Sequence, residues 1–505
     1  MLHSLTIDNF KAFSSRQTAH LAPITLIYGP NSGGKSSIIQ SLLLQKQSME
    51  SKINTGIKKK FLIPNGAHVD LGQSKSMHHG HNLDKPISFG MQISDPAFSA
   101  SFNTPAQDGD VLSVYASFKD FGVLGKRPLP ELVKVQLGIM SLYGRDFNIG
   151  LQREAQKSPP LLSDEEELIS GSQIFRENFF RFRRHDEVEQ LLQFCEDRVA
   201  RPERYRSELS RQDALWLLEQ GRVSFRPMLS VANSTFLPSQ IRGPESRNVR
   251  GPDEYATASR VLFTIVRAYE RALGAVSYLG PLRSRPKRVY EYSRQFTNSV
   301  GVSGEYAIDA LGEKIDSEGV EVVSDRVNRW LEDFEIPYLL KVDEVGDEVL
   351  GDIAKLMLVD KRTGVTVAAT DVGFGIGQIL PIIIEGILAD QKPSRVTPPR
   401  VICVEQPELH LHPRLQAHIG DFFIETHRQN GCQWIAETHS ESILLRIQRR
   451  IREGLINSSD VSVVFVNPTG RAGSEIMQLR MSKSGDFIDE WPGGFFEEGF
   501  REMFG

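Results

Sequence analysis

Residues 24–47 contain the feature that most constrains the fold. A β-rich run (ITLIY, 24–28) is followed by a glycine-rich turn, and SSIIQSLLLQKQ (36–47) then has apolar residues at helical spacing. The turn GPNSGGKS (29–36) matches GxxxxGK[ST] at every fixed position. This order of strand, loop and helix is the one that a phosphate-binding loop requires. A chance glycine-rich turn is the alternative, but it does not explain the flanking elements.

Each residue type in this loop has a role in holding phosphate. Glycines let successive backbone N–H groups point at one anion, and the helix N-terminus adds a favourable dipole. We expect Lys35 to reach the β- and γ-phosphates and the Ser36 hydroxyl to ligate Mg²⁺. The predicted nucleotide-binding residues of the loop are Gly29, Asn31, Ser32, Gly33, Gly34, Lys35, Ser36 and Ser37. The sequence therefore predicts that ATP and Mg²⁺ bind here.

A second apolar strand ends in an acid. The run VICVE (401–405) has four apolar residues followed by Glu405. A P-loop ATPase needs an acid at a strand end to hold Mg²⁺, usually through water. Glu405 is therefore the predicted Mg²⁺-binding carboxylate. The other interpretation is a buried strand that merely exits at an acid.

Alternating β and α patterns occupy both ends of the chain. The last third contains, in order, a helix at 371–389, a strand at 401–405, a helix at 413–429, a strand at 434–437, a helix at 440–453 and a strand at 461–466. Such alternation implies an α/β fold with a largely parallel sheet. We expect the two ends of the chain to form one discontinuous nucleotide domain.

The middle of the chain has a different pattern. Alternating runs over 87–150 predict an antiparallel sheet, and residues 160–272, rich in Glu, Arg, Leu and Gln, predict a helical lobe. Strands return at about 337–369, with a hairpin turn near Thr363-Gly364. We therefore predict three parts: 1–150 with the phosphate loop and an antiparallel β subdomain, 151–335 as a helical insertion lobe, and 336–505 as the C-terminal part of the nucleotide domain.

Composition limits the location and the partners of the chain. A formal net charge of −5 over 505 residues excludes a globally basic nucleic-acid coat, although not a local basic patch. The three cysteines (Cys195, Cys403 and Cys432) form no CxxC pair, which argues against a disulfide framework or a cysteine-zinc finger. The sequence has no signal pattern and no apolar run of membrane-spanning length. We expect a cytoplasmic protein that does not contact the membrane.

Several motifs together give the chain a family resemblance. NFKAF (9–13), the phosphate loop, EQPELHLHP (405–413), ETHS (437–440) and the WPGGFF tail (491–496) resemble the ABC-type ATPases of the AAA family that are related to RecF, SMC and OLD-family proteins. In particular, they resemble the stand-alone ATPase subunits of bacterial anti-phage systems such as Septu. The resemblance covers both ends of the chain well and the middle poorly. It implies an ABC-type P-loop ATPase head with a mixed sheet.

The resemblance also implies catalytic roles. Glu405 matches the Mg²⁺-binding acid of the ABC DEP motif, and Gln406 falls where many ABC enzymes have the catalytic glutamate. A neutral amide cannot take a proton from water and can only orient it. Three outcomes stay open: slow hydrolysis, Glu408 as the base, or ATP that mainly holds a dimer together. His439 matches the switch histidine that contacts the γ-phosphate, or else it caps the next helix.

The segment DVGFGIGQ (371–378) resembles the ABC signature segment that opens a helix and meets the γ-phosphate of a second subunit. Its predicted nucleotide contacts are Gly375, Gly377 and Gln378. Relatives often have serine at the position of Gly377, so that hydroxyl is missing here. A plain glycine-rich turn before an apolar helix is the alternative.

Two more candidates lie near the N-terminus. Gln73 in VDLGQS is a candidate for the Q-loop glutamine that senses Mg²⁺ and water, and Lys11 in NFKAF is a candidate to flank the nucleotide. An ordinary loop glutamine and a surface lysine explain these residues equally well.

Weaker patterns suggest metal or nucleic-acid binding. Glu408, His410 and His412 would share a face of an extended segment, so a metal site competes with a loop at the subunit interface. Basic and aromatic residues interleave over 175–184. We favour an amphipathic helix there over nucleic-acid contacts.

A second basic cluster follows the apolar run before residue 280. Its members are Arg283, Arg285, Lys287 and Arg288. We expect them either to touch DNA or to reach a nucleotide across an interface.

Taken together, the residues and the resemblance predict an ATP-hydrolysing ABC-type ATPase. Two copies are expected to close around ATP, as a head-to-head dimer or a larger homo-oligomer, and to regulate a partner nuclease in antiviral (anti-phage) defence. The chain shows no nuclease constellation, so we expect the nuclease on a separate subunit. The alternatives are a RecF-like DNA-binding ATPase in DNA repair or recombination, and a non-hydrolysing ATP-dependent scaffold.

Overall fold

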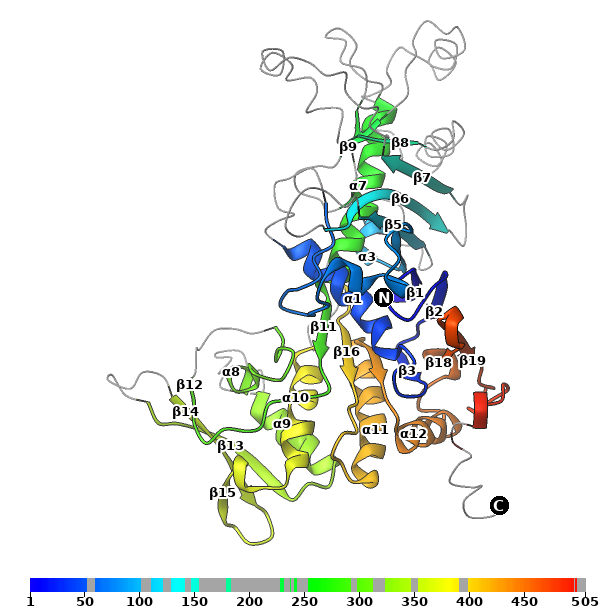
Figure 1. Ribbon diagram of the computed structural model, residues 1–505. Helices are drawn as coiled ribbons and strands as arrows, with labels where there is room; N and C mark the ends of the chain where they lie inside the picture. The colour runs from blue at the N-terminus through cyan, green and yellow to red at the C-terminus, as the bar shows by residue number, and fades with distance from the viewer. Residues whose placement is uncertain are drawn as a thin grey trace, which may run out of the picture. The chain divides into compact units, whose positions relative to one another are not determined.

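The computed structural model describes residues 1–51, 60–100, 110–120, 129–140, 147–153, 179–182, 228–230, 237, 240–242, 253–291, 298–311, 323–346, 353–389, 398–494 and 496. The chain divides into two compact units (Figure 1). Unit 1 comprises Met1–Thr18, Gln40–Gly274 and Arg395–Pro398, and unit 2 comprises Ala19–Ile39, Ala275–Ser394 and Pro399–Gly505.

A mixed sheet of six strands forms the centre of unit 2. In spatial order the strands are β11 (Val276–Leu279), β16 (Val401–Glu405), β17 (Gln433–Glu437), β3 (Ile24–Tyr28), β18 (Val461–Pro468) and β19 (Ser474–Leu479). All neighbours are parallel except β18 and β19, which are antiparallel. Figure 1 shows the blue β3 among the yellow and orange C-terminal strands. The predicted α/β fold, with both ends of the chain in one sheet, is confirmed.

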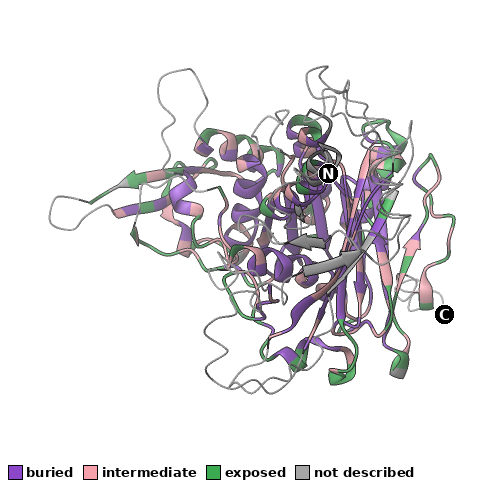
Figure 2. Ribbon diagram, turned by 90° about the horizontal axis from the view of Figure 1, so that it is seen from above, coloured by how far each residue is buried: buried purple, intermediate pink, exposed green. Residues whose placement is uncertain are grey.

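Burial explains why the central strands have continuous apolar runs. Every residue of β3, β16 and β17 is buried. Parallel strands are covered on both faces, so both sets of alternating side chains must be apolar. Figure 2 shows the buried residues along the strands and the neighbouring helices. The polar residues at the ends of these strands therefore stand out as the candidates for a site.

The helices of unit 2 are α8 (Ala307–Leu311), α9 (Val323–Asp333), α10 (Phe374–Leu388), α11 (Pro413–Asn430) and α12 (Glu441–Arg452). Two of them, α11 and α12, begin at residues whose side chains cap them. His412 caps α11 by accepting a hydrogen bond from the backbone N–H of Arg414 at 3.3 Å, and Gly431 ends the helix with φ of 68°. Ser440 caps α12 through its side chain, which accepts from the N–H of Ile443 at 3.2 Å.

An aromatic cluster joins helices to the sheet in unit 2. The Trp434 ring of β17 stacks on Phe423 with ring centroids 4.3 Å apart, and its Nε1 donates to Thr426 Oγ1 at 2.9 Å. Gly386 of α10 leaves room for the ring of Phe422, because a Cβ there would lie 2.4 Å from that ring. These contacts fix α10 and α11, which precede and follow the strand of Glu405.

A small antiparallel sheet completes unit 2. It pairs β12 (Tyr290–Glu291) and β13 (Tyr338–Glu344) with β14 (Ile353–Asp360), which also pairs with β15 (Thr366–Ala368). Gly364 has φ of 73° in the turn between β14 and β15. The predicted strands and hairpin turn over 337–369 are thus confirmed. Single-turn 3-10 helices in unit 2 are η4 (Ala369–Asp371), η5 (Ser458–Asp460), η6 (Gly470–Ala472) and η7 (Pro492–Gly494).

A sheet of nine strands dominates unit 1. Its order is β10 (Gln240–Arg242), β9 (Met228–Ser230), β8 (Phe179–Phe182), β7 (Phe147–Arg153), β6 (Glu131–Met140), β5 (Val111–Lys119), β4 (Ile87–Ile93), β1 (Leu2–Asp8) and β2 (Gln17–His20). The helices are α1 (Lys35–Glu50, which starts in unit 2), α2 (Ser74–Met77), η2 (His79–His81), α3 (Pro96–Ala100) and α7 (Asp253–Gly274). The antiparallel sheet predicted over 87–150 is confirmed.

The predicted helical lobe over 160–272 is only partly described. Helix α7 lies in it, but so do strands β8, β9 and β10. The amphipathic helix favoured for 175–184 is wrong at Phe179–Phe182, which pair with β7 and β9. Side chains alternate along FFRF with period two as well as with helical spacing, so a short run does not separate the two structures. The rest of the lobe lies outside the described residues, and the boundaries at 150 and 335 remain predictions.

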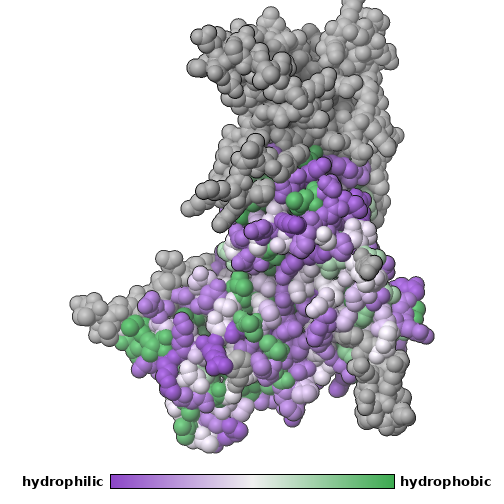
Figure 3. Space-filling model, in the orientation of Figure 1, coloured by the Kyte–Doolittle hydropathy of each residue, from purple (hydrophilic) through white to green (hydrophobic). Residues whose placement is uncertain are grey.

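The surface of the described residues is mixed in character. Figure 3 shows hydrophobic residues in small groups on a mostly hydrophilic face. No helix among the described residues combines the length and the apolar character needed to cross a bilayer.

Candidate nucleotide-binding site

The phosphate loop of unit 2 joins β3 to α1 through strained backbone. Gly29, Ser32 and Gly34 have φ values of 146°, 61° and 102°. At Gly29 a Cβ would lie 2.5 Å from the carbonyl oxygen of Val466, so no larger residue fits. Asn31 and Ser32 are exposed at the tip of the loop. The loop is thus a tight turn with an open outer side, as phosphate binding requires.

Lys35 is a buried cation at the base of this loop. Its side chain is 4% exposed, and its Nζ donates to the carbonyl oxygens of Gly29 and Pro30, each at 3.0 Å. Burial lowers the pKa of Lys35, while nearby carboxylates, with that of Glu437 first, raise it. The neighbouring Ser36 is half-buried and Ser37 is buried. The loop therefore carries a buried lysine that loop carbonyls and nearby acids stabilise.

Glu405 ends β16 in the middle of a hydrogen-bonded group. The hydroxyl of Tyr278, on the neighbouring strand β11, donates to Glu405 Oε1 at 2.9 Å. Burial and the charge of Glu405 raise the pKa of Tyr278, so the phenol stays a donor at neutral pH. Arg283 Nη2 donates to the backbone oxygen of Glu405 at 2.7 Å. The predicted Mg²⁺-binding carboxylate is thus held by two partners that the sequence analysis did not assign to it.

Gln406 follows Glu405 in a left-handed turn. Its φ is 45°, its N–H donates to the backbone oxygen of Glu437 at 2.7 Å, and its own oxygen accepts from Arg283 Nη1 at 3.3 Å. Arg283 is 4% exposed. Burial lowers the pKa of Arg283 to about 10, which still leaves it charged at neutral pH. Arg283 therefore fixes the turn after β16.

Glu408 links the turn after β16 to the turn after β17. Its Oε1 accepts from the backbone N–H of His439 at 2.6 Å, and its Oε2 accepts from Thr438 Oγ1 at 2.8 Å. Burial raises the pKa of Glu408, and these hydrogen bonds lower it. Burial and the charge of Lys35 lower the pKa of His439, so this imidazole is neutral at neutral pH. The two oxygens of Glu408 therefore hold the backbone turn of Thr438 and His439 in place.

Glu437 was missed by the sequence analysis. It ends β17, is 5% exposed, and places Oε1 3.9 Å from Lys35 Nζ. Its signal was present in the sequence, because WIAE ends in an acid just as VICVE does. Strands β16 and β17 are parallel with Glu405 paired to Glu437, so both acids reach the same edge of the sheet.

The signature-like segment opens a helix, as predicted. Helix α10 begins after Gly373, with Gly375 and Gly377 in its first turn. A Cβ at Gly377 would lie 2.8 Å from Pro286 Cδ, so the serine found in relatives has no room here. Gln378 is 1% exposed and buried within unit 2. Gly375 and Gln378 remain predicted contacts of a nucleotide on a second subunit.

The other two predicted nucleotide residues lie in unit 1. Lys11 has φ of 50°, and its Nζ donates to Gln40 Oε1 at 2.6 Å. Gln73 is exposed before α2, and its side chain makes no capping hydrogen bond to that helix. Their roles toward a nucleotide remain predictions.

The alternative metal site gains no support from the described part of the chain. No group of three or more His, Cys, Asp or Glu residues suited to a metal ion occurs there. His412 is used as the cap of α11, and Glu408 is used by the turn that carries His439.

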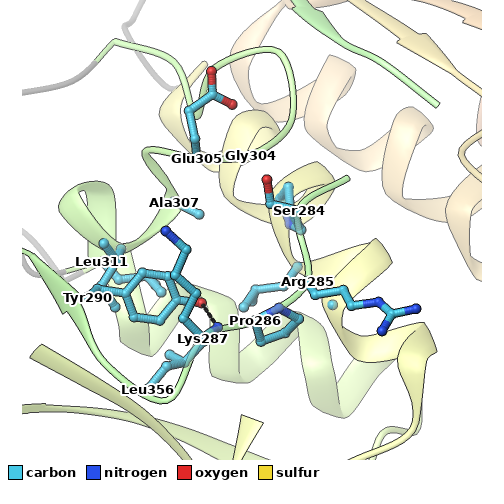
Figure 4. Close-up of a pocket in the computed structure, with 14 residues that line it drawn as sticks. Ser284, Arg285, Pro286, Lys287, Tyr290, Gly304, Glu305, Ala307, Leu311 and Leu356 are labelled. Carbon is cyan, nitrogen blue, oxygen red and sulfur yellow. Dashed lines mark hydrogen bonds between the residues drawn. The ribbon is translucent and has the colours of Figure 1, made fainter. Parts of the chain in front are cut away.

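The basic cluster at 283–288 is not one surface patch. Arg283 is buried, whereas Arg288 pairs with Asp371 at 2.6 Å. Arg285 and Lys287 line a pocket of about 70 Å³, together with Gly377 (Figure 4). The ring of Tyr290 forms one wall of it, and its hydroxyl accepts from the N–H of Lys287 at 2.8 Å. This pocket is too small for a nucleotide, and no phosphate-loop residue lines it.

Comparison with known proteins supports an ATPase. Residues 303–444 match the family described as AAA ATPase domain. The match includes the signature-like segment, Glu405 and His439, and the phosphate loop lies outside it. Among curated proteins, none matches the chain.

Similar solved structures are heads of SMC proteins. The SMC head bound to the C-terminal winged-helix domain of ScpA is 9% identical, with 96% of this chain and 98% of that chain covered and a TM-score of 0.39. The SMC head from Thermotoga maritima is 11% identical, with 95% and 99% covered and a TM-score of 0.34. A Pyrococcus furiosus SMC head with an extended coiled coil is also 11% identical, with 95% and 96% covered and a TM-score of 0.36.

These overall likenesses are weak, so the assignment rests on the family match and on the observed sheet and loop. The parallel sheet, the GxxxxGK[ST] loop after β3 and the acid at the end of β16 agree with the matched domain. Residues 303–444 are thus similar to an AAA ATPase domain, and the same parallel sheet carries the GxxxxGK[ST] loop.

Proposed function

We propose that this chain binds ATP together with Mg²⁺ at the phosphate loop and hydrolyses ATP to ADP and phosphate. One observation carries the proposal: the buried Lys35 of the loop lies among the acids that end β16 and β17, at one edge of a parallel sheet. Ligands of open α/β sheets bind outside the carboxyl ends of the strands. A buried cation beside oxygen-rich groups suits a phosphate chain with a divalent metal.

The donors at this edge fit Mg²⁺. Its preferred ligands are oxygens, with waters filling the remaining positions. The hydroxyl of Ser36 and the carboxylate of Glu405 would hold it, and Tyr278 fixes one oxygen of Glu405. Bound there, Mg²⁺ would supply positive charge close to the phosphate oxygens.

Three residues of the chain contact the phosphates or the attacking water. Lys35 exchanges its hydrogen bonds with the loop carbonyls for the β- and γ-phosphate oxygens. The neutral His439, oriented by Glu408, donates a hydrogen bond to the γ-phosphate. Gln406 orients the attacking water through its amide.

Phosphate release by the purified full chain tests this proposal. Wild type with ATP and Mg²⁺ is expected to release phosphate, and Lys35→Ala is expected to release at least about a hundredfold less. ATP binding by the wild type without phosphate release would support the non-hydrolysing scaffold instead.

We further propose that two copies close around ATP, each presenting the N-terminal end of its α10 to the other's γ-phosphate. The support is the position of Gly375 in the first turn of α10, where backbone N–H groups are not used within the helix. Sedimentation with and without ATP tests this, because ATP should shift the chain to a dimer or larger assembly. A chain that stays monomeric at saturating ATP contradicts it.

The resemblance to Septu-type ATPases supports a further proposal, that this cycle controls a separate nuclease in anti-phage defence. Co-expression with nuclease genes encoded beside it tests the proposal. Stable co-purification and ATP-dependent change of DNA cleavage are expected, with protection of cells against phage. Metal-dependent DNA cleavage by this chain alone would contradict a separate nuclease.

Burial of Arg283 weakens the RecF-like alternative, because one member of the basic cluster cannot touch DNA.

A further inference from the structure

In ATP hydrolysis by general-base catalysis, a carboxylate accepts the proton of the attacking water. The position that usually carries this carboxylate holds Gln406, whose amide has no useful basicity. If the chain uses a general base, another carboxylate near the phosphate loop supplies it. Three carboxylates lie close enough to Lys35 to raise its pKa. They belong to Glu437, Glu405 and Glu408.

Two of these acids are already occupied. One oxygen of Glu405 accepts from Tyr278, and this carboxylate is the one expected at Mg²⁺. Both oxygens of Glu408 accept hydrogen bonds, from Thr438 and from the N–H of His439. A carboxylate that accepts at both oxygens is a weaker base, because these hydrogen bonds stabilise its ionised form.

Glu437 is the acid that keeps an oxygen available. Its Oε2 is buried and has no hydrogen-bond partner among the described residues, while Oε1 faces Lys35 at 3.9 Å. A buried carboxylate oxygen without a partner is costly in a structural role. Its cost is explained if the oxygen receives a water once ATP is bound.

We propose that Glu437 is the carboxylate that binds and deprotonates the attacking water. The inference rests on the ATP hydrolysis proposed above. In the step, the water oxygen forms a bond to the γ-phosphorus as the bond from that phosphorus to the β–γ bridging oxygen breaks, which gives ADP and inorganic phosphate. Glu437 takes one proton from the water and then returns it to the phosphate or to solvent.

The surroundings of Glu437 suit this task. Lys35 faces one of its oxygens, and the side chain is almost fully buried. Glu405 faces it from β16 as its cross-strand partner.

The experiment compares ATP binding and phosphate release for wild type, Glu437→Gln, Glu408→Gln and Glu475→Gln, all as full chains. Glu475 is an exposed residue of β19 and serves as the matched control. Glu437→Gln is expected to bind ATP with nearly wild-type affinity and to release phosphate roughly a hundred- to thousandfold more slowly. Glu475→Gln is expected to match the wild type. Retained ATP affinity shows that the variant is folded.

A conservative variant separates a base from a structural residue. Glu437→Asp keeps a carboxylate, so part of the turnover should return, and its fall at acidic pH should occur at a different pH from that of wild type. Glu437→Gln with turnover within about threefold of wild type overturns the proposal, as does a loss of turnover confined to Glu408→Gln. Wild type that binds ATP but releases no phosphate refutes the hydrolysis itself, which is a distinct result.

Discussion

Oε1 of Glu437 lies 3.9 Å from Nζ of Lys35, and both side chains are buried. The phosphate-loop lysine thus has its negative partner on the strand beside β3, at the position expected to receive phosphate oxygens. ATP binding brings new negative charge to this place. In the proposed mechanism, Glu437 would then share Lys35 with the phosphates.

Burial of Glu437 predicts a pH-dependent effect on stability. A raised pKa means that the folded state holds the proton more tightly than the unfolded chain, so ionisation of Glu437 costs stability as pH rises. Glu437→Gln cannot ionise and should therefore melt at a higher temperature than wild type at neutral pH. The difference should shrink as pH falls toward the ordinary glutamate pKa. Thermal melts of both proteins across this pH range check it, and a variant less stable than wild type at neutral pH contradicts it.

Glu408 is predicted to position His439. Glu408→Ala removes the acceptor of two hydrogen bonds, so it should destabilise the protein by about 1–3 kcal/mol and lower turnover about tenfold or more. Glu408→Gln keeps one acceptor oxygen, so it should lose less stability and less turnover than Glu408→Ala. Denaturant unfolding and phosphate release measure the two effects. Equal loss in the two variants would show that the charge of Glu408, rather than its acceptor oxygens, matters.

Arg283 is predicted to hold the turn that carries Gln406. Arg283→Met leaves the backbone oxygens of Glu405 and Gln406 without this donor, and should destabilise the protein by about 1–3 kcal/mol. Arg285→Met is the matched control, because Arg285 is exposed on the same loop. Chemical denaturation of both variants checks the prediction. It fails if Arg285→Met costs as much stability as Arg283→Met.

Gly377 is predicted to be required by packing. A Cβ there meets Pro286 Cδ at 2.8 Å, so Gly377→Ala should destabilise the protein by about 1–3 kcal/mol. Gly373→Ala, at the start of the same helix, meets no atom within 4 Å and should be nearly neutral. Combining Gly377→Ala with Pro286→Ala should restore part of the loss. Unfolding midpoints of the three variants measure these changes in stability. A Gly377→Ala variant as stable as wild type contradicts the clash.

Much of unit 2 was predictable because each element has a local signal. The buried strands VICVE and ITLIY have continuous apolar runs, and α12 begins at the cap Ser440. Strand β8 was not predictable, because four residues fit both periodicities. Its pairing with β7 and β9 is a long-range property that local sequence does not contain.

The site was predictable only where a motif fixes the spacing. The phosphate loop and Glu405 follow from such motifs. Glu437 and Tyr278 enter through the pairing of β17 and β11 with β16, which brings residues far apart in the chain together. The missing hydroxyl at Gly377 was noted from the sequence, but its cause, Pro286, is a packing contact.

Equilibrium binding of ATP in the presence of Mg²⁺ tests most directly whether the phosphate loop holds the nucleotide. Wild type should bind ATP, and Lys35→Ala should bind at least about tenfold more weakly, because the buried ammonium contacts the phosphates. Equal affinity of wild type and Lys35→Ala, or no binding by either, would contradict a nucleotide site at this loop.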